Sequence, residues 1–493
     1  MSLPGSASGG PDPAGQTRAK PARVPGLAVA AAGTLLALVL FTGPLSSTPT
    51  LSRLLGADAA QQSWILSSTS LGLAVALIAS GSLGDEWGRR RVFLLGTMLG
   101  TAGSLLCFAA AAVPPGAAAA VFIAGRVVQG LGAAAMISCS AALIAAGAAD
   151  AVQRTKAMGV WGAAVSLGIA LGPMLGAVTS DAGIWYLAYA VMAVSGAALA
   201  IWGRLRLAES KAAEPRPVDW TGALLLAAAL ALILTGLTEG RRGWGQWGVL
   251  AALAAGGLLL LVFGWQQWRG KDPMLDLRIF RLPGLLGASV AAFAMGAGAI
   301  TMMSYASVIL LQDYGLPAVV AAMCLAVWAV VGIFASLLAR RLPHGFDGPG
   351  RFAVGFLLCV VGFLPWAFLR PGAGLLLPVL GLVVAGAGTG LVNATLGREA
   401  VAHLAARQAG MGSGLNNTVR YLGSAIGVTV FGVLATAGLG ARAATIGTSA
   451  AAVEGWDRAV WACLGVMLLA VLLVLCCGRA MRIAERAAAG TVR

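Results

Sequence analysis

The chain has 493 residues, of which 59% are hydrophobic and only 10% are charged. A soluble domain carries about 25% charged residues and needs polar cover, so this composition excludes a water-soluble globular protein. The net charge of +15 does not indicate a nucleic-acid-binding protein, because the basic residues lie in short segments between apolar runs.

Apolar runs long enough to cross a bilayer recur along almost the whole chain. Residues 1–25 are the exception, because their Pro, Gly, Ala and Ser content predicts a disordered tail. We predict an all-α polytopic membrane protein, since only helices or closed barrels satisfy the backbone in lipid. Its fourteen predicted spans lie near 26–46, 62–82, 92–112, 117–147, 157–178, 183–203, 220–238, 247–267, 284–311, 317–339, 352–369, 374–396, 409–437 and 458–478.

Two charged linkers, 204–219 and 268–283, set the seventh and eighth spans apart from the rest. The loop 339–351 stands in the second half where the loop 81–91 stands in the first, so the halves resemble each other. Two such bundles around a central cavity favour alternating access. The expected parts are a tail (1–25), a six-helix bundle (26–203), the linkers with two extra helices (204–283), a second six-helix bundle (284–478) and a tail (479–493).

The distribution of Lys and Arg predicts the sidedness of the chain. Of 33 such residues, 25 fall in tails and loops on the side of the termini and six on the other side. The remaining two, Arg126 and Arg420, lie inside spans. The positive-inside rule therefore places both termini in the cytoplasm. The expected location is a bacterial-type inner (cell) membrane.

The loop after the second span reads Gly81-Ser-Leu-Gly-Asp85-Glu-Trp-Gly88-Arg89-Arg90-Arg91. Gly88 allows a tight turn, Asp85 suits a helix N-terminus, and the arginines suit carboxylates or helix C-termini. A plain topogenic loop would also be rich in Arg, but it would leave the Gly-x-Leu-Gly-Asp part unexplained. We interpret Gly81, Asp85, Gly88, Arg89 and Arg90 as a cytoplasmic latch that locks one bundle against the other.

Polar residues inside three spans predict a site within the membrane. Arg126 and Gln129 share a face of the fourth span, and Asn416 and Arg420 share a face of the thirteenth. An intramembrane Arg usually faces the bundle interior or water, although it can also snorkel to the nearer surface. A plain cluster of helix–helix hydrogen bonds is the alternative for the thirteenth span. The candidates for substrate binding or proton coupling are Arg126, Gln129, Asn393, Asn416, Asn417 and Arg420.

The fifth span carries Gly168, Gly172 and Gly176 at four-residue spacing, together with Pro173. The glycines form a smooth groove for close helix packing, and the proline removes a backbone hydrogen bond and favours a kink. Ordinary packing of small residues explains the spacing equally well.

In combination, these segments resemble a known family between Trp64 and Gly432. The loop pattern G-x-L-x-D-x-x-G-R-R resembles the signature loop of the major facilitator superfamily. R-x-x-Q-G-x-G and G-x-x-x-G-P-x-x-G resemble its proton-transfer and antiporter motifs. With the Asp219-Trp220-x-Gly222 start and the Asp272-to-Phe280 end of the extra pair, the chain resembles the fourteen-helix drug:proton antiporters. This resemblance implies the major facilitator fold with two inserted helices, and efflux of lipophilic drugs, antibiotics or secondary metabolites in exchange for protons.

The sequence departs from that family at the first span, where an Asp is expected near Leu40 and no carboxylate is present. Ala177 also stands where a second Gly usually follows Gly176. We place none of the 18 Asp and Glu residues at the membrane centre. Our hypothesis is therefore a neutral or anionic substrate bound near Arg126 or Arg420. Proton coupling, where it exists, would use Asp313, Glu399 or Asp58 at the rim of the cavity.

Other functions remain open on the sequence. A proton-independent carrier, an importer or a non-transporting sensor fits the missing first-span carboxylate. An enzyme would need clustered polar groups at one depth, and the sequence offers no such cluster. No G-x-x-x-x-G-K-[ST] loop indicates ATP, and His344 and His403 lie far from Cys or paired carboxylates, so we expect no metal and no cofactor. The expected partners are the bilayer and a small lipophilic substrate, with the protein as a monomer.

Overall fold

The computed structural model describes residues 24, 26–211, 218–240, 243–270, 273, 282–312, 314–339, 342, 348–370, 374–402, 409–436 and 448–490. Within these ranges every regular element is helical, and fourteen helices are long and apolar enough to cross a membrane, as predicted. Several predicted features lie outside the described residues: most of the 1–25 tail, most of the 272–280 segment, Asp313, His344 and His403.

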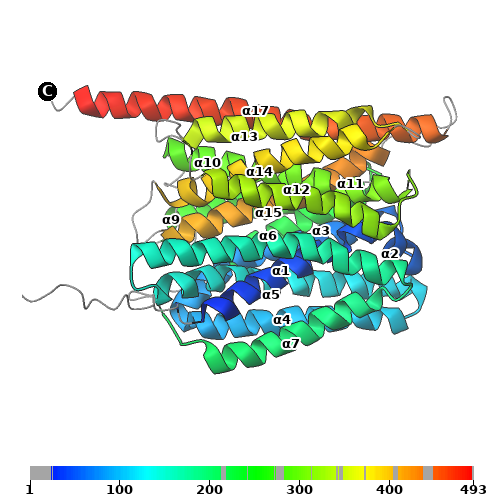
Figure 1. Cartoon of the computed structure of the whole chain (residues 1–493), viewed down its shortest axis with the longest axis horizontal. Coiled ribbons are helices and arrows are strands. Elements are labelled where there is room, and N and C mark those ends of the chain that lie inside the picture. The colour runs from blue at the N-terminus through cyan, green and yellow to red at the C-terminus, as the bar shows by residue number, and fades with distance from the viewer. Residues whose placement is uncertain are drawn as a thin grey trace, which may run out of the picture.

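The helices run side by side along one axis (Figure 1). The first bundle contains α1 (Leu27–Thr42) with its continuation η1 (Gly43–Ser46), the short α2 (Thr48–Leu54), α3 (Ala59–Trp87), α4 (Arg89–Ala109), α5 (Pro115–Gly147), α6 (Ala151–Asp181) and α7 (Tyr186–Arg206). The inserted pair is α8 (Trp220–Glu239) and α9 (Trp247–Arg269). The second bundle contains α10 (Pro283–Ala294), the π-helical η5 (Met295–Ile300), α11 (Thr301–Gln312), α12 (Ala318–Leu338), α13 (Gly348–Phe363), α14 (Leu376–Ala402), α15 (Ala409–Thr436) and α17 (Thr448–Gly490).

The last helix is longer than its predicted span, 458–478. It starts at Thr448 and reaches Gly490, so it includes most of the segment predicted as a tail. Ala, Met and Arg are strong helix formers, and they dominate the residues after 478. α1 begins and α17 ends at the same end of the bundle, which we call the inner end, and α2 lies at the opposite, outer end (Figure 1).

The two bundles repeat the same internal packing. In the first bundle, α4 and α5 approach so closely that a Cβ atom on Gly132 would collide with the backbone of Gly100. In the second bundle, α13 and α14 are the corresponding helices, and a Cβ atom on Gly388 would collide with the backbone of Gly355. Small residues let membrane helices approach in this way. The resemblance between the halves therefore extends from the sequence to the packing.

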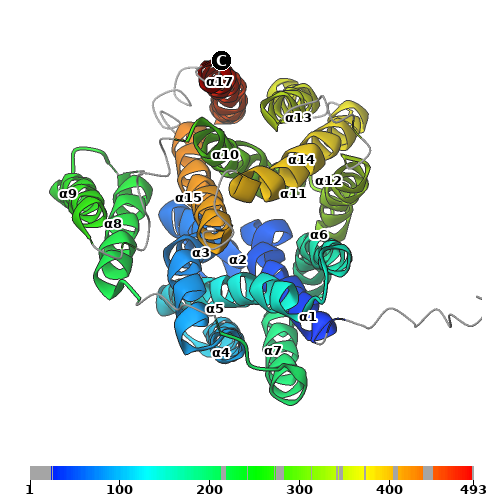
Figure 2. The ribbon, with the colours of Figure 1, turned by 90° about the vertical axis from the view of Figure 1, so that its left-hand side faces the viewer.

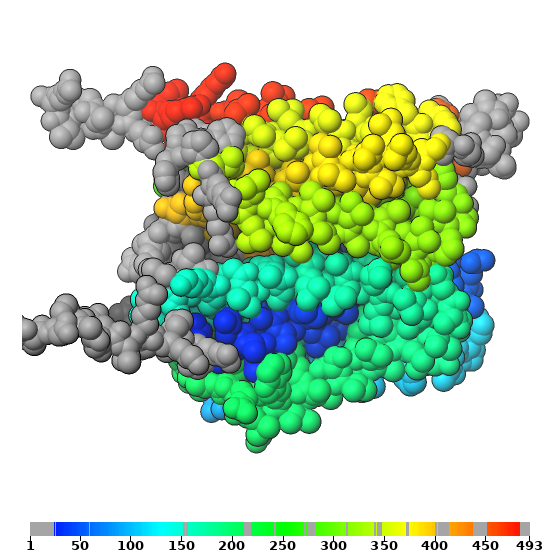
Figure 3. Space-filling model, in the orientation of Figure 1, coloured from blue at the N-terminus to red at the C-terminus, as the bar shows by residue number. Residues whose placement is uncertain are grey.

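The bundles meet through two equivalent helix pairs. The second helix of each bundle packs against the fifth helix of the other, so α3 contacts α15 and α12 contacts α6. Figure 2 shows both pairs on opposite sides of the molecule when it is viewed from the inner end. In the space-filling view, the surfaces of α6 and α12 meet along the boundary between the halves (Figure 3).

The inserted pair lies outside this arrangement, against one of the two seams (Figure 2). Helix α8 packs on both α3 and α15, and α9 packs on α8. Asp219 joins the two inserted helices, because it caps the N-terminus of α8 through the Gly222 amide (2.8 Å). It also accepts hydrogen bonds from Gln266 (3.0 Å) and the buried Gln267 (2.7 Å) of α9. The Asp219-Trp220-x-Gly222 pattern thus has a structural role.

We expect Asp219→Ala to lower the free energy of unfolding by about 2–3 kcal/mol. The change removes a helix cap, about 1 kcal/mol, and leaves the buried Gln267 amide without its carboxylate acceptor. Asp58→Ala is the matched control, since Asp58 caps α3 at an exposed position and should cost about 1 kcal/mol or less. Thermal unfolding of both variants in detergent checks this, and equal losses would contradict the role of Gln267.

Candidate functional site

Arg126 is completely enclosed within the first bundle. Its side chain and that of Gln129 are 0% exposed on α5. One terminal nitrogen, Nη1, donates to the carbonyl of Leu40 and to Oε1 of Gln129 (2.8 Å), and Nη2 donates to the carbonyl of Phe41 (2.9 Å). Gln129 in turn donates to Oγ of Ser104 (2.9 Å). Arg126 therefore does not snorkel to a membrane surface.

The carbonyls that bind Arg126 come from the end of a broken helix. Helix α1 ends at Thr42 and continues as a short 3₁₀ turn that contains Pro44. Proline has no N–H, so it cannot bond the Leu40 carbonyl four residues earlier. Arg126 takes that carbonyl as an acceptor. At Leu40, where the family resembled by this chain usually has an Asp, the partner of Arg126 is the backbone carbonyl.

Arg420 lies at the junction of the two bundles. Its Nη2 donates to Oδ1 of Asn417 (2.6 Å), and its guanidinium lies 5.0 Å from the ring centroid of Tyr421. The Tyr421 ring packs edge-on against Phe41 of the first bundle, with centroids 5.3 Å apart. The two membrane arginines therefore lie on either side of one aromatic pair, because Phe41 also supplies a carbonyl to Arg126.

Several polar atoms of the predicted site are enclosed without a hydrogen-bond partner among the described residues. They are Nε of Arg126, Oδ1 of Asn393, Nδ2 of Asn416 and Nε of Arg420. Asn393 lies on α14, and no hydrogen bond in the described part of the chain joins it to the Arg420 cluster. The structure therefore gathers Asn416, Asn417 and Arg420 on one helix, and holds Arg126 and Gln129 separately.

The glycine stripe of α6 packs on α1 and not across the bundles. Cβ atoms on Gly172 and Gly176 would collide with Thr42 and with the Gly43 carbonyl, and one on Gly168 would lie 2.5 Å from the Leu35 carbonyl. Pro173 lies inside the helix between them. The stripe thus presses α6 against the same broken end of α1 that binds Arg126.

Ala177 lies on another face of α6. It is fully buried against Ala318 and Ala322 of α12, in the second bundle. The departure from the family pattern therefore falls at the contact between the halves, where a methyl group fills the interface.

Three contacts close the outer end between the bundles. Asp181, at the end of α6, accepts hydrogen bonds from the Ala318 and Val319 amides (3.1 Å each) at the start of α12. Ser307 of α11 donates to the carbonyl of Leu45. Leu45 is also buried with residues of α3 and α15. Asp181 thus caps a helix of the other bundle, where the helix dipole favours its negative charge.

The arginines of the predicted latch contact carboxylates and the C-terminal end of α7. Asp85 pairs with Arg89 (2.8 Å), and the Arg90 amide donates to Glu209 (3.0 Å). Gly88 has a φ of 111°, and a Cβ atom there would lie 2.5 Å from Oε1 of Glu209. Glu209 belongs to the linker after α7. Among the described residues, this loop therefore binds its own bundle and the linker in this conformation, and not the second bundle.

The first position of the latch motif has a packing role. A Cβ atom on Gly81 would lie 3.3 Å from Oγ of Ser138 on α5, so α3 and α5 are close at this level. The neighbouring Glu86 accepts a hydrogen bond from the Val218 amide (3.0 Å), just before α8. The loop region is thus also tied to the start of the inserted pair.

The predicted rim carboxylates differ in their surroundings. Asp58 is exposed and forms a capping box with Gln61 at the start of α3, and Asp313 lies outside the described residues. Glu399 is the one buried carboxylate in the described part of the chain. It pairs with Arg398 (2.7 Å), and a Cβ atom on Gly348, at the start of α13, would collide with it.

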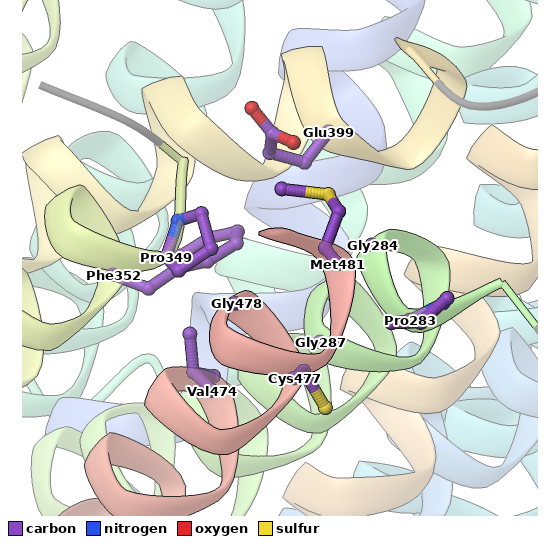
Figure 4. Close-up of a pocket in the computed structure, with 10 residues that line it drawn as sticks. All are labelled: Pro283, Gly284, Gly287, Pro349, Phe352, Glu399, Val474, Cys477, Gly478 and Met481. Atoms are coloured by element: carbon purple, nitrogen blue, oxygen red, sulfur yellow. The ribbon is translucent and has the colours of Figure 1, made fainter. Parts of the chain in front are cut away.

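Glu399 borders a small cavity formed by α10, α13, α14 and α17 (Figure 4). Its volume of about 10 Å³ is enough for about one water molecule and too small for an organic substrate. Figure 4 shows Met481 directed toward Glu399, with Pro349 and Phe352 at one side.

Comparisons with known proteins agree with this architecture. The family model of the Major Facilitator Superfamily matches residues 29–428. Multidrug resistance protein Stp of Mycobacterium tuberculosis (strain CDC 1551 / Oshkosh) is 30% identical over 381 residues, which cover 77% of this chain and 69% of the relative. Cephamycin export protein CmcT of Amycolatopsis lactamdurans is 30% identical over 393 residues, 76% of this chain and 77% of the relative. The POT family transporter PepTSo has a similar fold, with a TM-score of 0.68 at 14% identity over 93% of this chain and 98% of that one.

We expect Asp181→Ala to shift the protein toward an outward-open form. The loss of two charge-assisted hydrogen bonds at an exposed position should weaken the outer closure by about 1–2 kcal/mol, a factor of about 5–30 in population. The readout is labelling of Leu45→Cys by an impermeant thiol reagent. Asp457→Ala is the control, because Asp457 pairs with Arg370 (2.9 Å) at the outer end without joining the bundles. Equal labelling in both variants would refute the role of Asp181 in closing the outer end.

We expect Arg126→Gln to destabilise the protein much more than Arg420→Gln. Loss of Arg126 leaves the Leu40 and Phe41 carbonyls buried without a donor, at about 1–3 kcal/mol each. Loss of Arg420 removes hydrogen bonds to the side chains of Asn417 and Tyr421, and neither of these bonds involves a backbone carbonyl. Melting temperatures of the purified variants test the difference, and a wild-type value for Arg126→Gln would contradict it.

Proposed function

Because the chain belongs to the Major Facilitator Superfamily, we propose that it is a secondary active transporter that exports small lipophilic molecules by alternating access. The observation that carries the proposal is the seam between the bundles, where α3 pairs with α15 and α6 with α12. Across this seam, Oγ of Ser70 on α3 lies 3.4 Å from Oγ of Ser424 on α15. Relatives named as multidrug resistance and cephamycin export proteins support efflux as the direction.

The closed outer end supports an inward-facing state in this proposal. Asp181 and Ser307 hold the bundles together there, and the latch loop at the inner end makes no hydrogen bond or ion pair with described residues of the second bundle. In the outward-facing state the outer contacts would break and the latch would form. The same scheme puts both termini in the cytoplasm, with the 25 basic residues of the inner loops and tails.

Glu399 is our candidate for proton coupling. It is buried on α14 of the second bundle, and it has room for about one water molecule beside it. Arg398 and the N-terminus of α13 both interact favourably with its negative charge. These contacts join Glu399 to the start of α13, so movement of the helices at the inner end would change the surroundings of this carboxylate.

A proton-independent carrier is the second candidate function. One observation favours it: the part of the first bundle that surrounds Arg126 offers only carbonyl, amide and hydroxyl partners, and no carboxylate. Arginine itself does not release its proton in proteins. In that case the substrate gradient alone would drive transport.

Proteoliposomes with a pH gradient distinguish these functions. We expect addition of a transported compound to cause proton movement in the wild type, with cationic, neutral and anionic lipophilic compounds tested in turn. Glu399→Gln should abolish proton movement and preserve exchange of labelled for unlabelled substrate. Asp457→Asn serves as the control, since it removes a carboxylate from the outer end of the same bundle.

Each outcome selects one function. Substrate flux without proton movement in the wild type would refute coupling and leave the proton-independent carrier. Persistent coupling in Glu399→Gln would remove Glu399 from the mechanism. Silence across the panel of compounds would contradict the transport proposal itself.

A further inference from the structure

We propose that the face of α15 formed by Asn416 and Arg420 binds an anionic group, a carboxylate or a phenolate, of the exported molecule. The inference rests on the proposed export of lipophilic molecules and specifies their chemistry. It also gives the two membrane arginines different roles: Arg420 recognises the substrate, and Arg126 stabilises the fold of the first bundle.

The first argument is a surplus of hydrogen-bond donors. Asn416 is 7% exposed, and its Nδ2 is enclosed without an acceptor in the described structure. Nε of Arg420 is enclosed in the same way. Residues four apart are neighbours on a helix surface, so the two groups share one face. An unpaired buried donor costs about 1–3 kcal/mol, and a ligand oxygen between them would remove that cost.

The second argument is that the Arg420 guanidinium is held in place. Asn417 accepts from its Nη2 (2.6 Å), the Tyr421 hydroxyl lies 3.4 Å from the same nitrogen, and the Tyr421 ring packs beneath the plane. Phe41 holds the Tyr421 ring from the other bundle. A planar guanidinium fixed in this way matches the two oxygens of a carboxylate. Because the side chain is already ordered, ligand binding avoids the entropy cost of ordering it.

The third argument concerns position. One turn after Arg420, Oγ of Ser424 lies 3.4 Å from Oγ of Ser70 on α3, so this part of α15 lies at the seam between the bundles. Arg420 is only partly buried, whereas Arg126 is 0% exposed. A group at the seam becomes accessible from each side of the membrane in turn when the bundles move. Arg420 therefore lies where a transported molecule can reach it.

The fourth argument is the balance of charge. Arg126 is 0% exposed and is held by two backbone carbonyls and Gln129, so its unpartnered Nε is enclosed by protein and lies out of reach of a ligand. Glu399 is buried at the inner end of the second bundle, where it is paired with Arg398. In the described part of the chain, no other carboxylate is buried. Among the described residues, an organic cation would find no buried carboxylate at the seam, and an anion would find Arg420.

A matched set of ligands tests the inference. The probes are 1-naphthylacetate, its neutral amide 1-naphthylacetamide, and the cation 1-naphthylmethylamine, which share one ring. Binding to the full chain in nanodiscs is measured by isothermal titration calorimetry. We expect the acid to bind about tenfold more tightly than the amide, because hydrogen bonds to charged groups are stronger than neutral ones. The amine should bind most weakly.

Three variants locate the effect. Arg420→Gln should abolish the preference for the acid over the amide, and Arg420→Lys should retain part of it, because the charge remains without the fork. Asn416→Asp should also abolish the preference, since its carboxylate would pair with Arg420 and repel the acid. Arg479→Gln is the matched control, because Arg479 is exposed on α17 and lies away from the seam. Melting temperatures near the wild-type value show that each variant is folded.

The outcomes separate this inference from the proposed function. Equal binding of acid and amide by the wild type, no binding of either, or an unchanged preference in Arg420→Gln would overturn the anion site. A preference that Arg420→Lys also loses completely points to shape and not charge, and it would overturn the site as well. Selective binding without flux in proteoliposomes would support the anion site and contradict the transporter.

Discussion

The structure depends on one enclosed charge, that of Arg126. A buried guanidinium without partners costs several kcal/mol, and a carboxylate is the usual compensation. Here the compensation comes from the interruption of helix α1. Pro44 leaves the Leu40 carbonyl free, and Arg126 binds this carbonyl together with that of Phe41. The charge thus fixes where α1 must end, and the first bundle is arranged around that end.

The break in α1 connects the interior of the first bundle to the contacts that close the outer end between the two bundles. The glycine stripe of α6 presses on Thr42 and Gly43, and the turn that follows presents Leu45 to α11 of the second bundle. Asp181, at the end of the same helix α6, caps α12. Because packed elements resist gradual deformation, movement of α6 against α1 and release of the outer contacts would occur together. We propose this coupled movement as the role of the glycine stripe in this chain.

Much of the fold could be predicted from the sequence, because apolar length, charge distribution and motif order are all local signals. The fourteen spans were predicted within a few residues, apart from the extended α17, where an Ala-rich helix continues past the apolar run. The contacts of the site could not be predicted. Nothing in the Arg126 motif says that its partner is a carbonyl of Leu40, although Pro44 was a visible signal. The binding of the latch loop to Glu209, and the capping of α12 by Asp181, depend on tertiary distances that no spacing encodes.

The missing first-span carboxylate changes how a proton could act. In a site where Asp and Arg share a bond, protonation of Asp would release the Arg for other partners. A peptide carbonyl does not titrate, so the bonds between Arg126 and α1 contain no carboxylate whose protonation could release the arginine. Our proposals place coupling at Glu399 and recognition at Arg420. Arg420 and Glu399 lie on different helices of the second bundle, one at the seam and one at the inner end. Substrate charge and proton charge would therefore be sensed at separate places and would communicate only through the movement of that bundle.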